Sequence, residues 1–438
     1  MHSEHIQRRE FSMTVDDQRK VRIERMAKLA RVYRGWSAAQ MSEALGREQS
    51  RVGPASGNPK LDLVARLADA LDWEIGDVAE RVWRGKGARD ADLRALPFAD
   101  LDARAQTEHR AGEYASMERT GNAMRLIAGT ARERAVAANR LAGAYDGVGR
   151  YNRMLDTVRE GLSERHIGVD VRTMLTINLA NAYYTLWNLH EARSIAESVL
   201  ERFAEDPART RLERVAEAFG RALRGHARRR MLGTCESPEE QRALAASAAH
   251  DLGLAADLYT GLFGDFDDPQ YQGLAHTARG GLLEARVAAG ELAPEAALEK
   301  ILTELDGFVD IAAPRPAQMI ESCGWWSVFG ANVAMRAGEE NAAGLCERSG
   351  LEQALAICTN KAAEVGEHLQ HWPMRERAFT LEWFRKQTIP WMKPADCASW
   401  MLDAEDVRVL VGAMGRFPYF RPTGWAILDR AVLAGVGM

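Results

Sequence analysis

Arg140-Leu-Ala-Gly-Ala-Tyr145 recurs 38 residues later in the chain as Asn178-Leu-Ala-Asn-Ala-Tyr183. In both copies an alanine, Ala142 or Ala180, precedes the tyrosine by three positions, which places the two side chains on one face of a helix. The small residue allows two helices to approach closely, and the aromatic ring fills the space beside it. A turn and a second helix with apolar periodicity follow each copy. The pattern therefore predicts two consecutive helical hairpins.

Weaker hairpin patterns extend toward the C-terminus. Residues 274–305 predict a helix pair that is interrupted at Gly290–Pro294. Apolar periodicity in residues 325–336 and 351–370 predicts a further pair. This arrangement resembles the tetratricopeptide repeat, although its period of 38 residues exceeds the usual length of about 34 residues.

The resemblance implies an all-α fold, with an α-solenoid over residues 105–388 and a C-terminal helical cap over residues 389–438. Such an array presents a concave surface lined by the first helix of each pair. Asparagine can pair with a peptide backbone as donor and acceptor, and arginine suits a carboxylate. In the register of the repeat, four residues face this surface and form the predicted peptide-binding site: Asn139, Arg140, Asn181 and Tyr184. The alternative is that the asparagines bond only to neighbouring turns.

A different helical pattern precedes the repeats. Residues 21–34 have apolar positions at helical spacing, and Gly35 is expected to end that helix. Ser37, with Gln40 three positions later, has the spacing of a capping box at the start of a second helix. Gly46 then supplies a left-handed turn after this second helix.

Asn58-Pro59 is predicted to start a later helix, because asparagine is a favoured N-cap and proline is tolerated in the first turn. Apolar positions from Ile75 to Val82 predict a fifth helix. The layout resembles the XRE-type helix-turn-helix domain of phage repressors. The resemblance implies a five-helix DNA-binding domain over residues 15–84, followed by a linker over residues 85–104.

In that family the third helix enters the major groove of DNA. Arginine can pair bidentately with guanine, and glutamine with adenine. The resemblance places six residues at the DNA: Arg47, Gln49, Ser50, Arg51, Arg34 and Ser37. However, only 11 residues separate Gly46 from Asn58, and Gly53-Pro54 shortens the third helix. The alternative is that this helix has decayed and the module serves dimerisation or packing.

The charge of the chain is unevenly distributed. The net charge is -5, of which residues 1–90 carry +3 and the remainder carries -8. Residues 19–51 alone carry +6. A basic patch at one end of an acidic chain is the electrostatic footprint of a phosphate-binding end. A solvated charged helix is the alternative interpretation.

The sequence has no enzyme motif, and we expect neither a cofactor nor a metal. P-loop, dinucleotide-binding, metalloprotease and nucleophile-elbow patterns do not occur. The five cysteines are scattered without C-x-x-C spacing, which argues against a disulfide framework and structural zinc and fits a reducing cytoplasm. No apolar stretch is long enough to span a membrane, and the N-terminus lacks the apolar segment of a secretory signal.

These patterns together predict a cytoplasmic transcriptional regulator with a DNA-binding module and a helical-repeat sensor. The architecture resembles the peptide-responsive quorum-sensing regulators grouped as RRNPP. This resemblance implies a homodimer that binds a palindromic operator in double-stranded DNA, with a peptide or protein effector in the repeat groove. Two alternatives are a protein-interaction scaffold with a degenerate helix-turn-helix, and a regulator that inhibits a kinase or phosphatase through its repeats.

Overall fold

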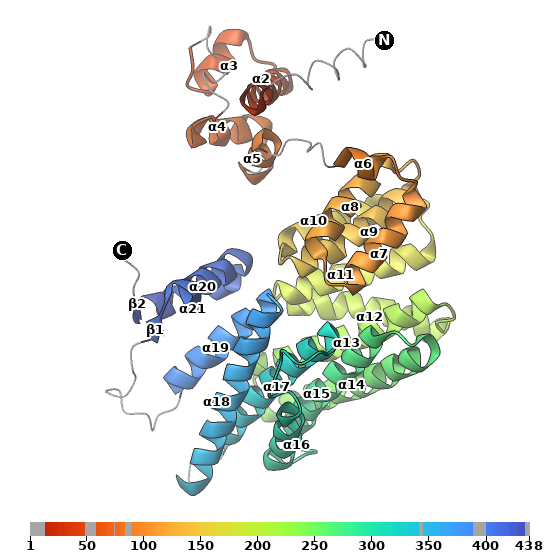
Figure 1. The fold of residues 1–438 in the computed structure, drawn as a ribbon, viewed down its shortest axis with the longest axis vertical. Coiled ribbons are helices and arrows are strands. Elements are labelled where there is room, and N and C mark those ends of the chain that lie inside the picture. Colours follow the sequence, from red (N-terminus) through yellow and green to blue (C-terminus); the bar gives the residue numbers. More distant parts are fainter. Residues whose placement is uncertain are drawn as a thin grey trace. The chain divides into compact units, whose positions relative to one another are not determined.

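The chain divides into two compact units, residues 1–95 and residues 96–438. Both are built from helices (Figure 1), and the strands among the described residues are two short segments that pair in parallel, β1 (Trp400–Leu402) and β2 (Ala431–Leu433). The all-α class predicted from the sequence is confirmed. The computed structural model describes residues 14–48, 58–73, 75–83, 90–340, 345–388 and 400–433.

The N-terminal unit is a small helical domain with its own core. Among its described residues its helices are α2 (Val15–Arg34), α3 (Ala38–Ala44), α4 (Leu61–Leu71), α5 (Ile75–Trp83) and α6 (Asp90–Arg94). The apolar faces of α2 to α5 meet in one cluster, whose fully buried members include Ile23, Leu45, Leu63, Leu67 and Val78. Because this core is closed on itself, the unit is a domain in its own right.

The turns of this domain follow the sequence closely. Gly35 ends α2 with a φ of 67°, and Gly46 follows α3 with a φ of 62°. Ser37 and Gln40 form the reciprocal bonds of a capping box at the start of α3. These predictions are confirmed, because each rests on a local interaction that the neighbouring residues alone determine.

The predicted start of the fourth helix is wrong by two residues. Helix α4 begins at Leu61, and its N-cap is Lys60 without a side-chain bond. The Asn58 side chain instead accepts a hydrogen bond from Trp83 Nε1 over 3.3 Å. Pro59 is buried ahead of the helix. A long-range contact with α5 therefore replaces the local cap that asparagine would otherwise supply.

The second unit is a succession of helices that pack against one another (Figure 1). Its first half consists of α7 (Phe98–Arg110), α8 (Tyr114–Ile127), α9 (Ala131–Gly147), α10 (Tyr151–Ser163), α11 (Val169–Thr185) and α12 (Leu189–Glu205). The next part consists of α13 (Arg211–Met231), η2 (Leu232–Thr234), α14 (Pro238–Phe266), α15 (Pro269–Ala289), α16 (Pro294–Asp306), α17 (Ala317–Glu340), α18 (Leu345–His368) and α19 (Trp372–Thr388). The last helices are α20 (Ala404–Arg416), η3 (Pro418–Phe420) and α21 (Arg421–Leu428). Helix α7 begins within the stretch that the sequence analysis assigned to the linker.

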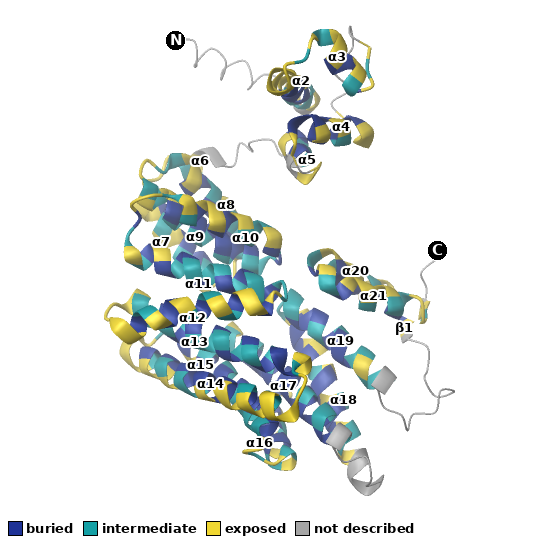
Figure 2. Cartoon of the chain, turned by 180° about the vertical axis from the view of Figure 1, so that it is seen from behind, coloured by how far each residue is buried: buried dark blue, intermediate teal, exposed yellow. Residues whose placement is uncertain are grey.

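The 38-residue offset of the sequence reappears in the structure. Helices α9 and α11 begin 38 residues apart and end 38 residues apart. The alanines of the repeated motif, Ala142 and Ala180, are fully buried between helices. The turn after each helix has one left-handed residue, Gly149 with a φ of 73° and Trp187 with a φ of 68°. The two predicted hairpins are therefore present. Figure 2 shows the buried faces of such helices turned toward their neighbours.

The C-terminal helices pack against the start of α10 and the end of α11. A cluster of buried residues joins Tyr151 of α10 to Phe417 and Phe420. The rings of Tyr151 and Phe417 stack with centres 5.2 Å apart, and those of Trp187 and Tyr419 do the same at 5.2 Å. The predicted cap is helical, but it also bridges back to α10 and α11, because these aromatic side chains find apolar surface there.

Candidate functional site

One exposed face of α2 presents three cations, Arg25, Lys28 and Arg31. No hydrogen bond or ion pair to these three side chains is found within the described part of the chain. Their spacing of three residues places successive members on neighbouring positions of the helix surface. Cations that are free of carboxylate partners are available to DNA phosphates.

Arg34 and Ser37, both predicted to contact DNA, have structural partners. Arg34 Nη2 donates to Asp72 Oδ1 over 2.6 Å and to the Asp69 carbonyl over 2.8 Å. Arg34 Nε donates to the Ala70 carbonyl over 2.9 Å, so this guanidinium holds the C-terminal end of α4. Ser37 Oγ accepts the Gln40 backbone N–H. DNA contact by either residue stays a prediction.

The predicted base-reading segment follows α3 directly. Arg47 is half-buried, and its backbone N–H donates to the Ser42 carbonyl over 2.8 Å. Gln49, Ser50 and Arg51 lie outside the described residues. Arg47 is therefore placed just after the turn that ends α3, and its contact with bases stays a prediction.

Asn139 and Arg140 bind residues of neighbouring helices in the second unit. Asn178 Nδ2 donates to Asn139 Oδ1 over 2.7 Å, which links α11 to α9. Arg140 Nε donates to Asp102 Oδ1 over 2.6 Å, which links α9 to α7. The Arg140 side chain is 25% exposed, so solvent still reaches it. Both residues thus connect successive hairpins, whatever else they bind.

Asn181 and Tyr184 of α11 also have partners within the chain. The Asn181 side chain interacts with the Asp146 carboxyl group, and the Tyr184 hydroxyl interacts with Arg229. The Arg230 guanidinium lies over the Tyr184 ring, 3.9 Å from its centre. Binding of a peptide by these residues stays a prediction, and such a ligand would have to bridge or exchange the contacts that they already make.

A polar cluster that the sequence analysis missed connects α9 to the last helices. Glu321 of α17 lies with its Oε1 3.3 Å from Nε2 of His371, which precedes α19. Trp325 Nε1 donates to the same carboxylate oxygen over 3.3 Å. Asp146 of α9 interacts electrostatically with both groups. No sequence motif marks the cluster, because its ionisable members come from distant parts of the chain.

The surroundings shift the pKa values of this cluster. Burial raises the pKa of Asp146 to about 6. Burial lowers the pKa of His371, but the Glu321 carboxylate outweighs this effect and leaves the pKa raised. Burial raises the pKa of Glu321, and the contacts with His371 outweigh it, so that this pKa is lowered. Asp146 is therefore the carboxyl group of the cluster that gives up its proton near pH 6.

We predict that Asp146→Asn stabilises the protein at pH 8 and has little effect at pH 4. The folded state holds the Asp146 proton more tightly than the unfolded chain, so the carboxyl group favours folding below its ordinary pKa of 3.8 and loses this contribution as the pH rises through about 6. A neutral amide avoids that loss, which amounts to about 3 kcal/mol for a shift from 3.8 to about 6. Urea denaturation at both pH values measures the effect. Asp156→Asn on α10 is the control, because that carboxylate is exposed. An equal effect of Asp146→Asn at both pH values would contradict the prediction.

Two further features bear on the kind of site. Within the described ranges, no three histidine, cysteine, aspartate or glutamate side chains are grouped so that they could hold a metal ion. No helix in the same ranges combines the length and apolarity needed to cross a membrane.

The comparisons with known proteins give little further assignment. Neither the models of known protein families nor the curated proteins include a match to this sequence. Among solved structures, the chain is similar to Bacillus thuringiensis PlcR in complex with the peptide PapR7 and DNA, with a TM-score of 0.35 and 15% sequence identity. The similarity covers 68% of this chain and 99% of that chain. A similarity of this size assigns neither a family nor a function.

Proposed function

We propose that the chain is a DNA-binding transcriptional regulator whose helical-repeat unit binds a peptide or protein effector. The observation that carries the proposal is the exposed cation face of α2, formed by Arg25, Lys28 and Arg31. These cations belong to a separate compact unit, in which the next helix, α3, begins with the predicted capping box. A structural role would pair these cations with carboxylates, as Arg34 is paired with Asp72. DNA phosphates would supply the missing anions.

The repeat unit supports the sensor half of the proposal. Polar side chains of α7, α9 and α11 connect successive helices: Asp102–Arg140 and Asn139–Asn178 are hydrogen bonds, and Asp146 interacts with Asn181. A peptide that engaged these side chains would change the bonds between successive hairpins. A ligand that prefers one arrangement of the hairpins shifts the equilibrium toward it. We propose that the regulator is a homodimer, so that such a change alters the fit to a palindromic operator.

We predict a steep salt dependence of DNA binding that the α2 cations largely determine. Each phosphate contact contributes about 0.9 to the slope of log affinity against log salt, so replacing Arg25, Lys28 and Arg31 together by alanine should reduce the slope by about 2 to 3. Fluorescence anisotropy of a labelled duplex, titrated at several salt concentrations, measures it. The control replaces Arg165, Arg242 and Lys300, exposed cations of the second unit with the same total charge. An unchanged slope in the α2 variant would contradict the proposal.

A specific observation favours protein contact as a second use of the N-terminal domain. Leu29, Val32, Tyr33 and Trp73 form an exposed apolar surface beside the end of α4, and Val32 is 79% exposed. In a homodimer, this surface could pair two copies. Val32→Glu should then lower the mass measured by sedimentation toward 48.5 kDa, the mass of one chain. A wild-type mass of 48.5 kDa without DNA, together with one chain per duplex when DNA is bound, would contradict the dimer.

A further inference from the structure

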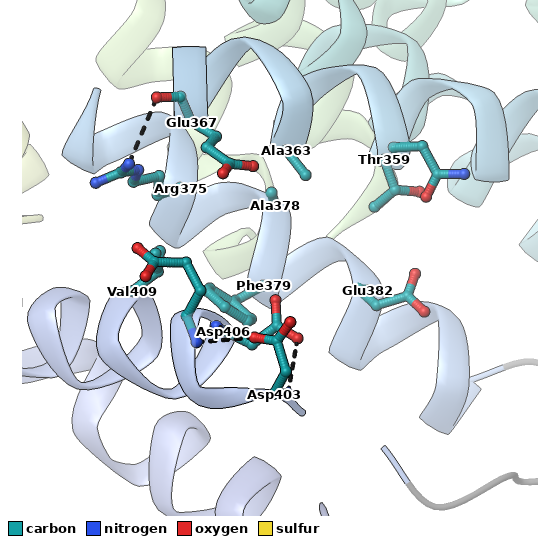
Figure 3. Close-up of a pocket in the computed structure, with 12 residues that line it drawn as sticks. Thr359, Ala363, Glu367, Arg375, Ala378, Phe379, Glu382, Asp403, Asp406 and Val409 are labelled. Carbon is teal, nitrogen blue, oxygen red and sulfur yellow. Dashed lines mark hydrogen bonds between the residues drawn. The ribbon is translucent and has the colours of Figure 1, made fainter. Parts of the chain in front are cut away.

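A pocket of about 310 Å³ lies between α18, α19 and the start of α20 (Figure 3). Ala378, Phe379 and Val409 form the apolar part of its wall, and charged side chains form the rest. Small-molecule sites in proteins begin at about 300 Å³, so the pocket is large enough for a small ligand such as a single amino acid. It shares no residue with the Asp146 cluster or with the cation face of α2.

Arg375 is the only cation among the described residues that line the pocket. The residue is 5% exposed, and its Nε has no hydrogen-bond partner in the described structure. Its Nη2 reaches the Glu367 carbonyl oxygen only at 3.5 Å, and its guanidinium carbon lies 4.8 Å from the centre of the Trp372 ring. Burial lowers the pKa of Arg375. Glu367 and Glu405 attract the Arg375 guanidinium electrostatically, but no carboxylate of the described residues forms an ion pair with it. A ligand carboxylate would satisfy this buried guanidinium in a bidentate manner.

Carboxylates surround the rest of the pocket. Figure 3 shows Glu367 entering it from α18, with Asp403 and Asp406 on the opposite side at the start of α20. Asp403 Oδ1 accepts backbone N–H groups of α20, and Asp406 Oδ2 accepts that of Asp403, so each carboxylate keeps its other oxygen. Glu367 is exposed, and no bond to its carboxylate is found among the described residues.

The charges that line the pocket disfavour a ligand that carries only a negative or only a positive charge. A simple anion would compensate Arg375 but would lie beside Glu367 and Asp406, which repel it. A simple cation would be attracted to those carboxylates but would leave the buried guanidinium uncompensated. A ligand with a carboxylate and an ammonium group satisfies both ends, and an apolar side chain fits the wall of Phe379 and Val409.

We propose that this pocket binds a free α-amino acid with an apolar side chain, its carboxylate on Arg375 and its ammonium group on Glu367 and Asp406. The side chain packs on Phe379, and the bound molecule joins α18 and α19 to α20. The proposal does not depend on DNA binding, because none of these residues belongs to the N-terminal domain.

Isothermal titration calorimetry of the full chain tests the proposal with L-leucine and L-phenylalanine. Two analogues of leucine serve as matched probes: 4-methylpentanoate lacks the ammonium group, and isopentylamine lacks the carboxylate. We expect saturable binding of at least one amino acid and at least about 30-fold weaker binding of either analogue, the loss typical of one missing charged partner. Equal binding of an analogue would overturn the proposal. So would a dissociation constant above about 10 mM for both amino acids, which corresponds to a binding free energy weaker than about 2.7 kcal/mol.

Variants of the chain locate the binding. Arg375→Met should abolish it, and Glu367→Gln should weaken it about 30-fold or more. Because Glu367 is exposed, its variant keeps the test valid even if Arg375→Met fails to fold. Arg242→Met is the control, since Arg242 is exposed on α14 and does not line the pocket. Unchanged binding in Glu367→Gln, or an equal loss in Arg242→Met, would contradict the assignment.

Discussion

Asp251→Ala is expected to lower the free energy of unfolding by about 3–5 kcal/mol, the cost of leaving buried charges without their partner. Asp251 of α14 has no exposed surface. It accepts hydrogen bonds from Arg224 Nε and Nη2 over 2.8 and 2.6 Å and from Arg228 Nη1 over 2.6 Å. Both arginines belong to α13, so one carboxylate fixes two cations across the interface of α13 and α14. Glu197 lies 3.3 Å from Arg224, but it is half-exposed and cannot replace Asp251.

Urea denaturation monitored by circular dichroism measures this change. Asp265→Ala is the matched control. Asp265 of α14 also forms an ion pair with an arginine of α13, Arg214, over 2.6 Å, but its side chain is 53% exposed. An exposed pair contributes less than about 1 kcal/mol. If Asp251→Ala and Asp265→Ala had the same effect, the buried carboxylate would not have the role that we assign to it.

Gly149→Ala is expected to destabilise the protein by about 2–5 kcal/mol and to release the C-terminal helices. Gly149 has a φ of 73°, and a Cβ there would lie 2.6 Å from Trp372 Cδ1 and 2.8 Å from Arg416 Nε. The left-handed backbone costs about 1–2 kcal/mol for alanine, and the clash with the stacked Trp372 and Arg416 side chains adds about 1–3 kcal/mol. Trp372 and Arg416 belong to α19 and α20, so the clash falls where these helices meet the hairpin of α9 and α10.

Gly112→Ala separates the two contributions. Gly112 has nearly the same φ, 71°, but a Cβ there meets no atom within 4 Å. Its variant should lose only the backbone contribution. Hydrogen exchange of the amides in α20 and α21 should accelerate in Gly149→Ala and stay unchanged in Gly112→Ala. Equal exchange in both variants would show that the C-terminal helices do not depend on this contact.

Local features of the fold could be predicted from the sequence. The small alanines Ala142 and Ala180 set the 38-residue offset, and both are buried where expected. Gly35 and Gly46 have the predicted left-handed conformation. These successes share a cause: helix ends and the close approach of paired helices depend on residues within one or two turns. The prediction of Asn58 as the N-cap of α4 is wrong, because its side chain binds Trp83, which is distant in the sequence.

Long-range features could not be predicted. The direction in which the hairpins progress depends on small rotations between neighbours, which accumulate along the array. That accumulation brings Asp146 near His371 and Tyr151 against Phe417. The periodicity of apolar residues in the sequence does not indicate which distant residues come into contact. The candidate sites follow the same rule, since Ser37 and Gly46 determine the two ends of α3 locally, whereas the Arg375 pocket assembles from three separate helices.

Selection of duplexes from a random DNA pool by the full chain tests the central claim most directly. The account predicts enrichment of an inverted repeat whose half-sites lie about 10 base pairs, or a multiple, apart. Arg47→Ala should lower the preference for the selected sequence by about 1–3 kcal/mol if Arg47 reads a base. If no sequence is enriched, and the chain binds all duplexes of the pool with equal affinity, the chain does not act as a sequence-specific regulator.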